Sequence, residues 1–148
     1  MPHAGLMDER ALGPEAGPFM RARLHVRGGK RRLRQGKVPE GIVTIYDALI
    51  AAMEWYFASP ERRSRLIISK EDDLTDDKVL FEILTRSGVL DGSFDYNAFN
   101  DVVEQILYHD LKEIEYEEML QGIETVMVQL GIMPFDESKL PPEDPSTF

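Results

Sequence analysis

The side chains best suited to acid, base or nucleophilic chemistry are sparse in this chain. It has three histidines and no cysteine, which excludes disulfides, thiolate zinc sites, iron–sulfur clusters and thiol catalysis together. A catalytic nucleophile needs a base within hydrogen-bond reach. His109 and Asp110 are the only histidine and carboxylate that are neighbours in the sequence, and adjacent residues of a helix point in different directions. We expect His109 to be a helix-terminal cation and predict no catalytic residues.

A carboxylate-rich helical bundle could hold two metal ions, but the spacing that this requires is missing. Di-iron bundles use a Glu-x-x-His motif, whereas Ile106 occupies the glutamate position before His109. Helical RNases of the HEPN class need an arginine shortly before the histidine, and positions 103–105 hold none. We predict no metal site and no cofactor, and an enzyme without a recognisable motif stays as an alternative.

The segment SGVLDGSFDYNAF, residues 87–99, resembles the calcium loop of EF-hand proteins in its central Asp-Gly pair and in the apolar Phe94. Calcium needs carboxylates early in such a loop and a glutamate at its end. When Gly92 is aligned with the loop glycine, these positions hold Ser87, Val89 and Ala98. We therefore interpret the segment as a helix–helix turn in which Ser93 or Asp95 caps the next helix.

The strongest charge pattern is a basic segment, residues 21–37, in an otherwise acidic chain. The formal net charge is −10 at pH 7, yet residues 1–37 sum to +6 and residues 38–148 to −16. The basic segment has no carboxylate, and its cations are Arg21, Arg23, Arg27, Lys30, Arg31, Arg32, Arg34 and Lys37. These eight are the candidate contacts to a partner or to phosphates.

Several uses of the basic segment compete. The acidic body attracts it, so it could dock on acidic surface of its own subunit or of a partner. It could instead neutralise nucleic-acid phosphates, although it lacks the interleaved aromatics that stack bases and the acidic body would be repelled. A solvated extension without a role is a third interpretation.

Hydrophobic spacing predicts the elements that position these residues. Residues 1–20 contain six prolines and glycines, which predicts a flexible tail. Residues 20–27 alternate between apolar and polar, which is typical of a half-buried strand. Gly28-Gly29 could then turn the chain into a hairpin. We expect a basic, partly extended arm that ends at Lys37.

The rest of the chain shows helical periodicity. A central helix is predicted from Val38-Pro39 to Ser59-Pro60, because apolar residues surround most of its circumference. Further helices are predicted at residues 60–69, 75–88, 95–109 and 116–131, with Thr75 as an N-cap and glycines as stops at 88 and 131. The spacing leaves open whether the helix that reaches His109 continues beyond it. Arg62, Arg63 and Arg65 are expected to be solvated.

The predicted fold is therefore an all-α bundle of four or five helices. It comprises residues 38–133, between a flexible tail and basic arm at 1–37 and an acidic, Pro-rich tail at 134–148. Residues 1–20 do not form the apolar run of a signal peptide, and the apolar run at 42–57 is shorter than the ~20 residues that cross a bilayer. We expect a cytoplasmic protein without a membrane partner.

These observations favour a non-catalytic helical protein-interaction module or a small accessory subunit. In this hypothesis the basic arm docks on acidic surface, and the protein self-associates or binds a protein partner. The alternative is a nucleic-acid-associated regulator that binds phosphates through the arm.

Overall fold

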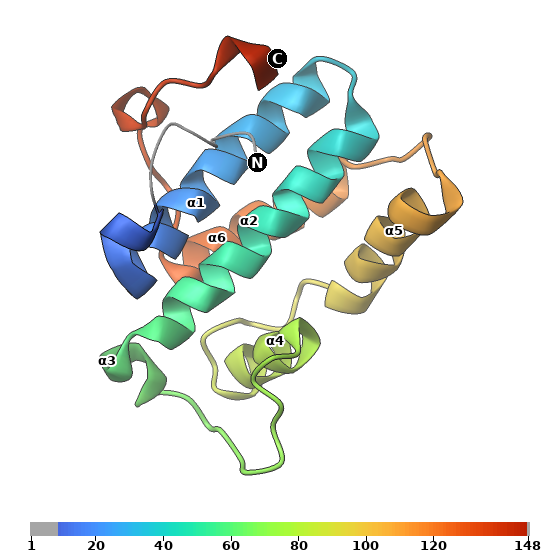
Figure 1. Ribbon diagram of the computed structural model, residues 1–148. Helices are drawn as coiled ribbons and strands as arrows, with labels where there is room; N and C mark the ends of the chain where they lie inside the picture. Colours follow the sequence, from blue (N-terminus) through green and yellow to red (C-terminus); the bar gives the residue numbers. More distant parts are fainter. Residues whose placement is uncertain (1–8, 148) are drawn as a thin grey trace.

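The chain is built from α-helices over residues 9–147, the range that the computed structural model describes (Figure 1). In order they are α1 Glu9–Arg34, α2 Val38–Ala58, α3 Pro60–Arg63, α4 Asp77–Arg86, α5 Tyr96–His109 and α6 Glu117–Leu130, followed by 3-10 turns at Glu137–Lys139 and Pro145–Thr147. The predicted all-α class is confirmed, with six α-helices in this range instead of four or five. α1 and α2 lie side by side and antiparallel, α6 lies behind them, and α4 and α5 lie on the other side of α2 from α1.

The predicted strand at residues 20–27 is wrong, because these residues lie inside α1. Ala22, Leu24 and Val26 are buried, and so is His25 between them. α2 covers α1 on one side and the C-terminal segment, residues 132–147, contacts it on another. A helix covered on several sides has no clear polar stripe, so a short alternation of residue types imitates a period of two. The arm predicted to be partly extended is therefore a helix.

The predicted flexible tail is also wrong over its described part, because α1 begins at Glu9. Gly13 has a φ of 88°, so α1 is two helical pieces joined by a kink. Pro14 follows directly, at the start of the longer piece, where its missing N–H breaks no helix hydrogen bond. Phe19 packs on Trp55 of α2 with ring centroids 5.1 Å apart. The remainder of that prediction, residues 1–8, lies outside the described residues.

α2 is the central helix, as its apolar circumference predicts. It begins at Val38 and ends before Ser59, and Leu49 and Met53 at its middle are fully buried. By length and composition α2 alone among the described helices could cross a membrane, but 61% of its most apolar window is buried inside the bundle. The structure therefore uses this apolar surface for packing against the other helices.

α1 and α2 approach each other closely where two glycines face across the helix pair. A Cβ on Gly29 would lie 2.7 Å from Ile45 side-chain carbons, and a Cβ on Gly41 would lie 2.8 Å from Leu33 Cδ2. Atoms in protein interiors do not approach so closely, so a larger residue at either position would separate the helices. Gly28 and Gly29 thus lie inside a helix and do not turn a hairpin.

Arg62, predicted to be solvated, closes the C-terminal end of α2. Its Nη2 donates to the Trp55 carbonyl oxygen at 2.6 Å, and its guanidinium lies 3.8 Å from the centroid of the Trp55 ring. The last carbonyls of a helix lack intrahelical partners and favour a cation. Nη2 also contacts Glu15 Oε1 at 3.0 Å, so this side chain joins α1, α2 and α3. Arg63 and Arg65 are exposed as predicted.

α4 begins one residue later than predicted. Asp76, and not Thr75, is its N-cap, and the Asp76 side chain accepts from the Lys78 N–H. The Thr75 hydroxyl instead donates to the Asp73 carboxylate at 2.6 Å. The predicted stop is confirmed, because Gly88, the residue after the C-cap Ser87, has a φ of 78°, a left-handed conformation that glycine adopts without strain.

α5 begins and α6 ends where their predicted cap residues lie. Asp95 caps α5 by accepting from the Ala98 N–H. Asp110 has a φ of 53°, which ends α5 at His109 and settles the question that the spacing left open. Gly131, with a φ of 94°, ends α6.

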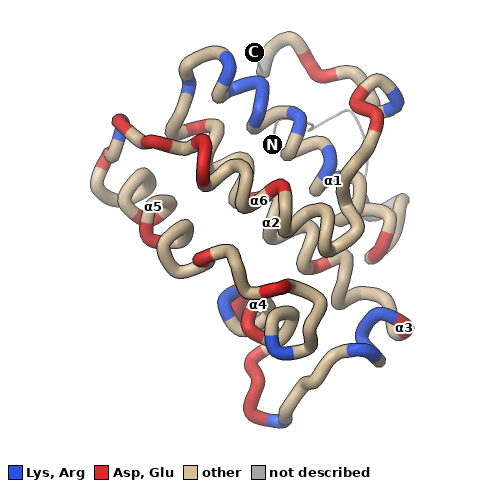
Figure 2. Tube along the Cα trace, turned by 180° about the vertical axis from the view of Figure 1, so that it is seen from behind, with Lys and Arg blue, Asp and Glu red and all other residues tan. Residues whose placement is uncertain are grey.

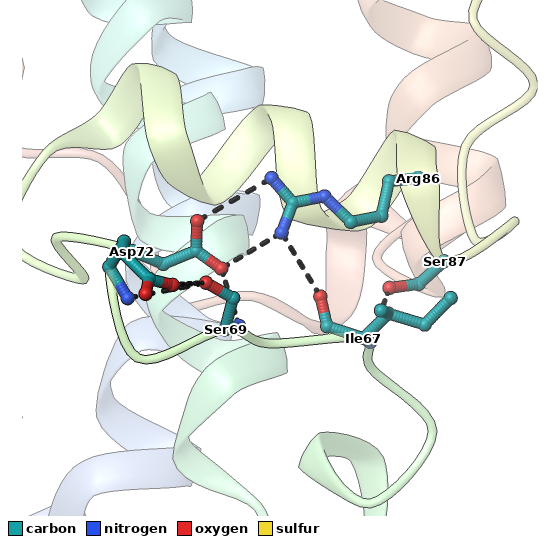
Figure 3. Close-up of polar contacts among 6 residues, drawn as sticks. Ile67, Ser69, Asp72, Arg86 and Ser87 are labelled. Atoms are coloured by element: carbon teal, nitrogen blue, oxygen red, sulfur yellow. Dashed lines mark hydrogen bonds and ion pairs between the residues drawn. The ribbon is translucent and has the colours of Figure 1, made fainter.

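The loop between α3 and α4 is fixed to α4 by polar contacts (Figure 3). Arg86 Nη1 donates to Asp72 Oδ2 at 2.8 Å and to the Ile67 carbonyl oxygen at 3.3 Å. The Ile67 N–H donates to Ser87 Oγ at 2.8 Å, and the Ser69 N–H donates to Asp72 Oδ2 at 2.8 Å. The Ser69 hydrogen bond, together with Arg86, holds the pKa of the Asp72 carboxyl below its usual value.

Substituting Gly29→Ala should destabilise the fold, because the new Cβ would push against Ile45. Overpacking of this kind costs about 1–3 kcal/mol, which urea or thermal unfolding would measure as a lower free energy of unfolding. Gly28→Ala is the matched control, since its Cβ would meet only the end of the Arg32 side chain, at 3.1 Å, and Glu143 Oε1, at 3.5 Å. Equal stability of the two variants would contradict the close helix contact.

Asp72→Asn should loosen the α3–α4 loop in a pH-dependent way. The folded-state pKa of Asp72 lies below its value in the unfolded chain. The ionised carboxylate therefore stabilises the fold above the unfolded-state pKa, and this stabilisation is lost as pH falls through the lower folded-state pKa. We expect the variant to melt at a lower temperature than the wild type near pH 7, and this difference to disappear at pH values below both pKa values. Glu82→Gln on the exposed side of α4 is the control, and a difference that persists unchanged in acid would refute the assignment.

Candidate interaction surfaces

Lysines and arginines gather along α1, whereas carboxylates gather along α5, α6 and the connection between them (Figure 2). The eight predicted cations are therefore carried by α1 and the turn after it. They face three directions: toward the C-terminal segment, toward α2 and α6, and toward solvent.

Two arginines hold the C-terminal segment by its end. Arg31 Nε lies 3.1 Å from both carboxylate oxygens of Glu143, and the Arg31 residue is only 7% exposed. Arg27 Nη2 donates to the Pro141 carbonyl oxygen at 2.6 Å. Charge-assisted hydrogen bonds of this type are stronger than neutral ones. These contacts therefore anchor the segment at two points, Pro141 and Glu143, which are two residues apart.

Arg23 contacts the start of the same segment. Its Nε donates to the Ile132 carbonyl oxygen at 3.0 Å, and its guanidinium lies 4.2 Å from the centroid of the Phe19 ring and 5.1 Å from that of Phe135. Burial lowers the pKa of this arginine, and the two ring faces favour its cationic form.

Arg21 and Lys30 point toward carboxylates of other helices. Arg21 forms an ion pair with Glu54 of α2, and Lys30 Nζ lies 3.8 Å from Glu124 Oε1 of α6. Burial raises the pKa of the nearby Asp47 carboxyl, and the charge of Arg21 opposes that shift. The basic helix therefore meets acidic side chains on both neighbouring helices.

The remaining three cations lie near the end of α1. Burial and repulsion from Arg31 lower the pKa of Arg32, while Glu143 and Glu40 oppose the shift. Arg34 and Lys37 are exposed at the turn into α2. These two cations are the ones most open to a phosphate in solution.

The histidines that the structure describes lie in different environments. His109 and Asp110 are both exposed at the end of α5, and His25 is buried within α1. No group of three or more His, Asp or Glu side chains among the described residues could hold a metal ion. Burial, reinforced by a hydrogen bond to Tyr46, raises the pKa of the Tyr96 hydroxyl far above its usual value.

A groove lies between the N-terminal part of α5 and α6, and we name it the α5–α6 groove. Both helices pack on α2, but their backbones make few close approaches to each other. The groove has a volume of about 530 Å³, and Phe94, Phe99 and Met119 supply its apolar lining. Gly122 lets Phe94 lie against α6, because a Cβ there would be 2.6 Å from Phe94 Cδ1.

The rim of the α5–α6 groove is acidic. Asp95, Glu115 and Glu118 line it, and residues 95–131 carry nine carboxylates and one lysine. Large apolar side chains are also exposed on the same two helices, at Leu107, Tyr108 and Val128. An apolar floor within an acidic rim is the opposite electrostatic environment to α1.

The α5–α6 groove is not evident from the sequence. Phe94 belongs there to the segment that resembles an EF-hand loop, and Met119 lies within the predicted helix at residues 116–131. The available signal is Gly122, a small residue in that helix which leaves room for an aromatic ring.

A second hollow of about 650 Å³ lies between α4 and the loop before α5, lined by Phe81, Phe94 and Tyr96 together with Lys78 and Arg86. Asp91, Gly92 and Ser93 form the predicted turn here, with the Ser93 N–H donating to Asp91 Oδ1 at 2.9 Å. The carboxylate of Asp91 is thus used by the turn itself, as its lowered pKa reflects.

Comparison of the chain with models of protein families, with curated proteins and with solved structures found no match.

Proposed function

We propose that this protein is a non-catalytic, helical protein-interaction module that receives a basic, amphipathic segment of a partner protein in the α5–α6 groove. The observation that carries the proposal is the groove itself, in which Phe94 and Met119 are partly exposed above the buried Phe99 and within a rim of carboxylates. Amphipathic helices bind grooves of this kind with their apolar face. The basic arm has a separate, intramolecular use.

Charge complementarity argues for a basic partner. The α5–α6 region carries an excess of carboxylates, and its rim residues Glu115 and Glu118 are exposed beside the apolar floor. Complementary potentials speed encounter and reject partners of the same sign. A partner segment with lysines or arginines on either side of an apolar side chain would complement both the acidic rim and the apolar floor of the groove.

The contacts of the basic arm support docking on its own chain over the nucleic-acid alternative. Five of its eight cations contact a carboxylate or a carbonyl oxygen elsewhere in the chain: Arg21, Arg23, Arg27, Lys30 and Arg31. A cation already paired gains less from a phosphate, and the salt-dependent affinity for nucleic acid depends on the number of phosphates that are neutralised.

A labelled amphipathic helical peptide, with leucines on one face and lysines on the other, is a direct probe of the α5–α6 groove. We expect fluorescence anisotropy to show binding that weakens at least about tenfold when Glu115→Lys and Glu118→Lys are combined, because like charges then face each other. Glu61→Lys with Glu137→Lys is the matched control, since both of these glutamates are exposed and outside the groove.

The outcomes of this experiment separate the two functions. Equal loss of peptide binding in the groove variant and in the control would show a general charge effect and contradict the proposed site. Tight binding of a labelled oligonucleotide that falls steeply with salt, and that Arg34→Gln with Lys37→Gln removes, would favour the nucleic-acid alternative instead.

A further inference from the structure

We propose that the face of α1 carrying Arg27 and Arg31 is a binding site for an extended acidic peptide, and that the end of the C-terminal segment of the same chain occupies it. This site is distinct from the α5–α6 groove and takes a ligand of opposite charge. The C-terminal segment of the protein is therefore a tethered ligand that competes with an acidic segment of another protein for this site.

The contacts to the tail have the form of peptide recognition. Arg27 donates to the main-chain carbonyl oxygen of Pro141, and Arg31 lies against the Glu143 carboxylate. Arg23 instead donates to the carbonyl oxygen of Ile132, a buried core residue at the base of the tail. Main-chain contacts give affinity for any extended peptide, while a charged pocket selects one side chain. The site thus binds an extended main chain through one carbonyl oxygen, that of Pro141 in the tail, and through a carboxylate side chain two residues later, that of Glu143.

The tail beyond Phe135 can leave without opening the core. Met133 and Phe135 pack against the core, whereas every residue from 136 to 146 is exposed or only partly buried. Leu140 and Pro141 are partly buried against the surface, and the short turn at Glu137–Lys139 is exposed. Segments with few buried apolar contacts open at low free-energy cost.

The α1 site also has more donors than the tail satisfies. Among the described residues, Arg27 Nε and Arg32 Nη1 are buried and have no hydrogen-bond partner. Buried donors without acceptors are costly, so a ligand with additional carboxylate oxygens would satisfy groups that Glu143 does not reach.

The test uses a fluorescein-labelled peptide with the sequence of residues 138–147 and the full-length protein. A tethered segment competes at an effective concentration on the order of millimolar, so the wild type should bind the probe weakly. Glu143→Gln in the protein weakens the tethered competitor, and we expect the probe to bind this variant at least about tenfold more tightly. Glu137→Gln in the same segment is the matched control and should bind like the wild type.

The same peptide also tests the contact between Arg31 and the Glu143 carboxylate. Glu143→Gln in the probe should remove its binding to the Glu143→Gln protein, and so should Arg31→Gln added to that protein, whose helix content circular dichroism would verify. Equal affinity for wild type and the Glu143→Gln variant, no binding to that variant, or binding that survives the change in the probe would each overturn the proposal.

A second measurement detects release of the tail through its rate of cleavage by trypsin. Trypsin cleaves after Lys139, within the exposed turn. We expect faster cleavage there in the Glu143→Gln protein than in the wild type or in the Glu137→Gln control, because the tail is released more often. Equal cleavage rates in all three proteins would show that Glu143 does not hold the tail and would overturn the proposal.

Discussion

The close contact between α1 and α2 is the constraint on which the rest of the structure depends. Gly29 and Gly41 allow the two backbones to approach, and Ile45 and Leu33 fill the space that a Cβ would need. This contact packs the basic segment, residues 21–37, into the bundle as part of α1. The lysine and arginine side chains then extend away from the α1–α2 contact. The positions of the ion pairs to α2 and α6, and of the C-terminal segment, follow from that orientation.

The two charged surfaces of the molecule are therefore built in different ways. On α1, cations meet acceptors of the same chain, and Arg31 is nearly enclosed by the tail that it binds. Along α5 and α6, carboxylates surround an apolar groove and find few cations nearby. One surface is occupied and the other is open, which is why we assign them to different ligands, an acidic peptide and a basic one.

Part of the candidate chemistry could be predicted from residue types and part could not. The eight cations are recognisable as one group in the sequence, because they form a run of lysines and arginines without a carboxylate, and the structure places them on α1 and the turn after it. Their partners were not identifiable, since Glu143 and Arg31 are separated by more than one hundred residues and no local pattern links them. The groove was missed because its lining comes from the turn at Phe94 and the helix at Met119, which meet only after both have packed on α2.

The amino-acid sequence by itself determined the features that depend on a few neighbouring residues. These are the bounds of α2 at Val38 and Ser59, the caps at Asp95 and Gly131, and the all-α class. Only the tertiary structure decided that residues 20–27 form a helix instead of a strand, because a short alternating pattern satisfies either period until α2 and the C-terminal segment cover it. It also decided which charges meet, since Coulomb attraction depends on distances between atoms that only packing brings together.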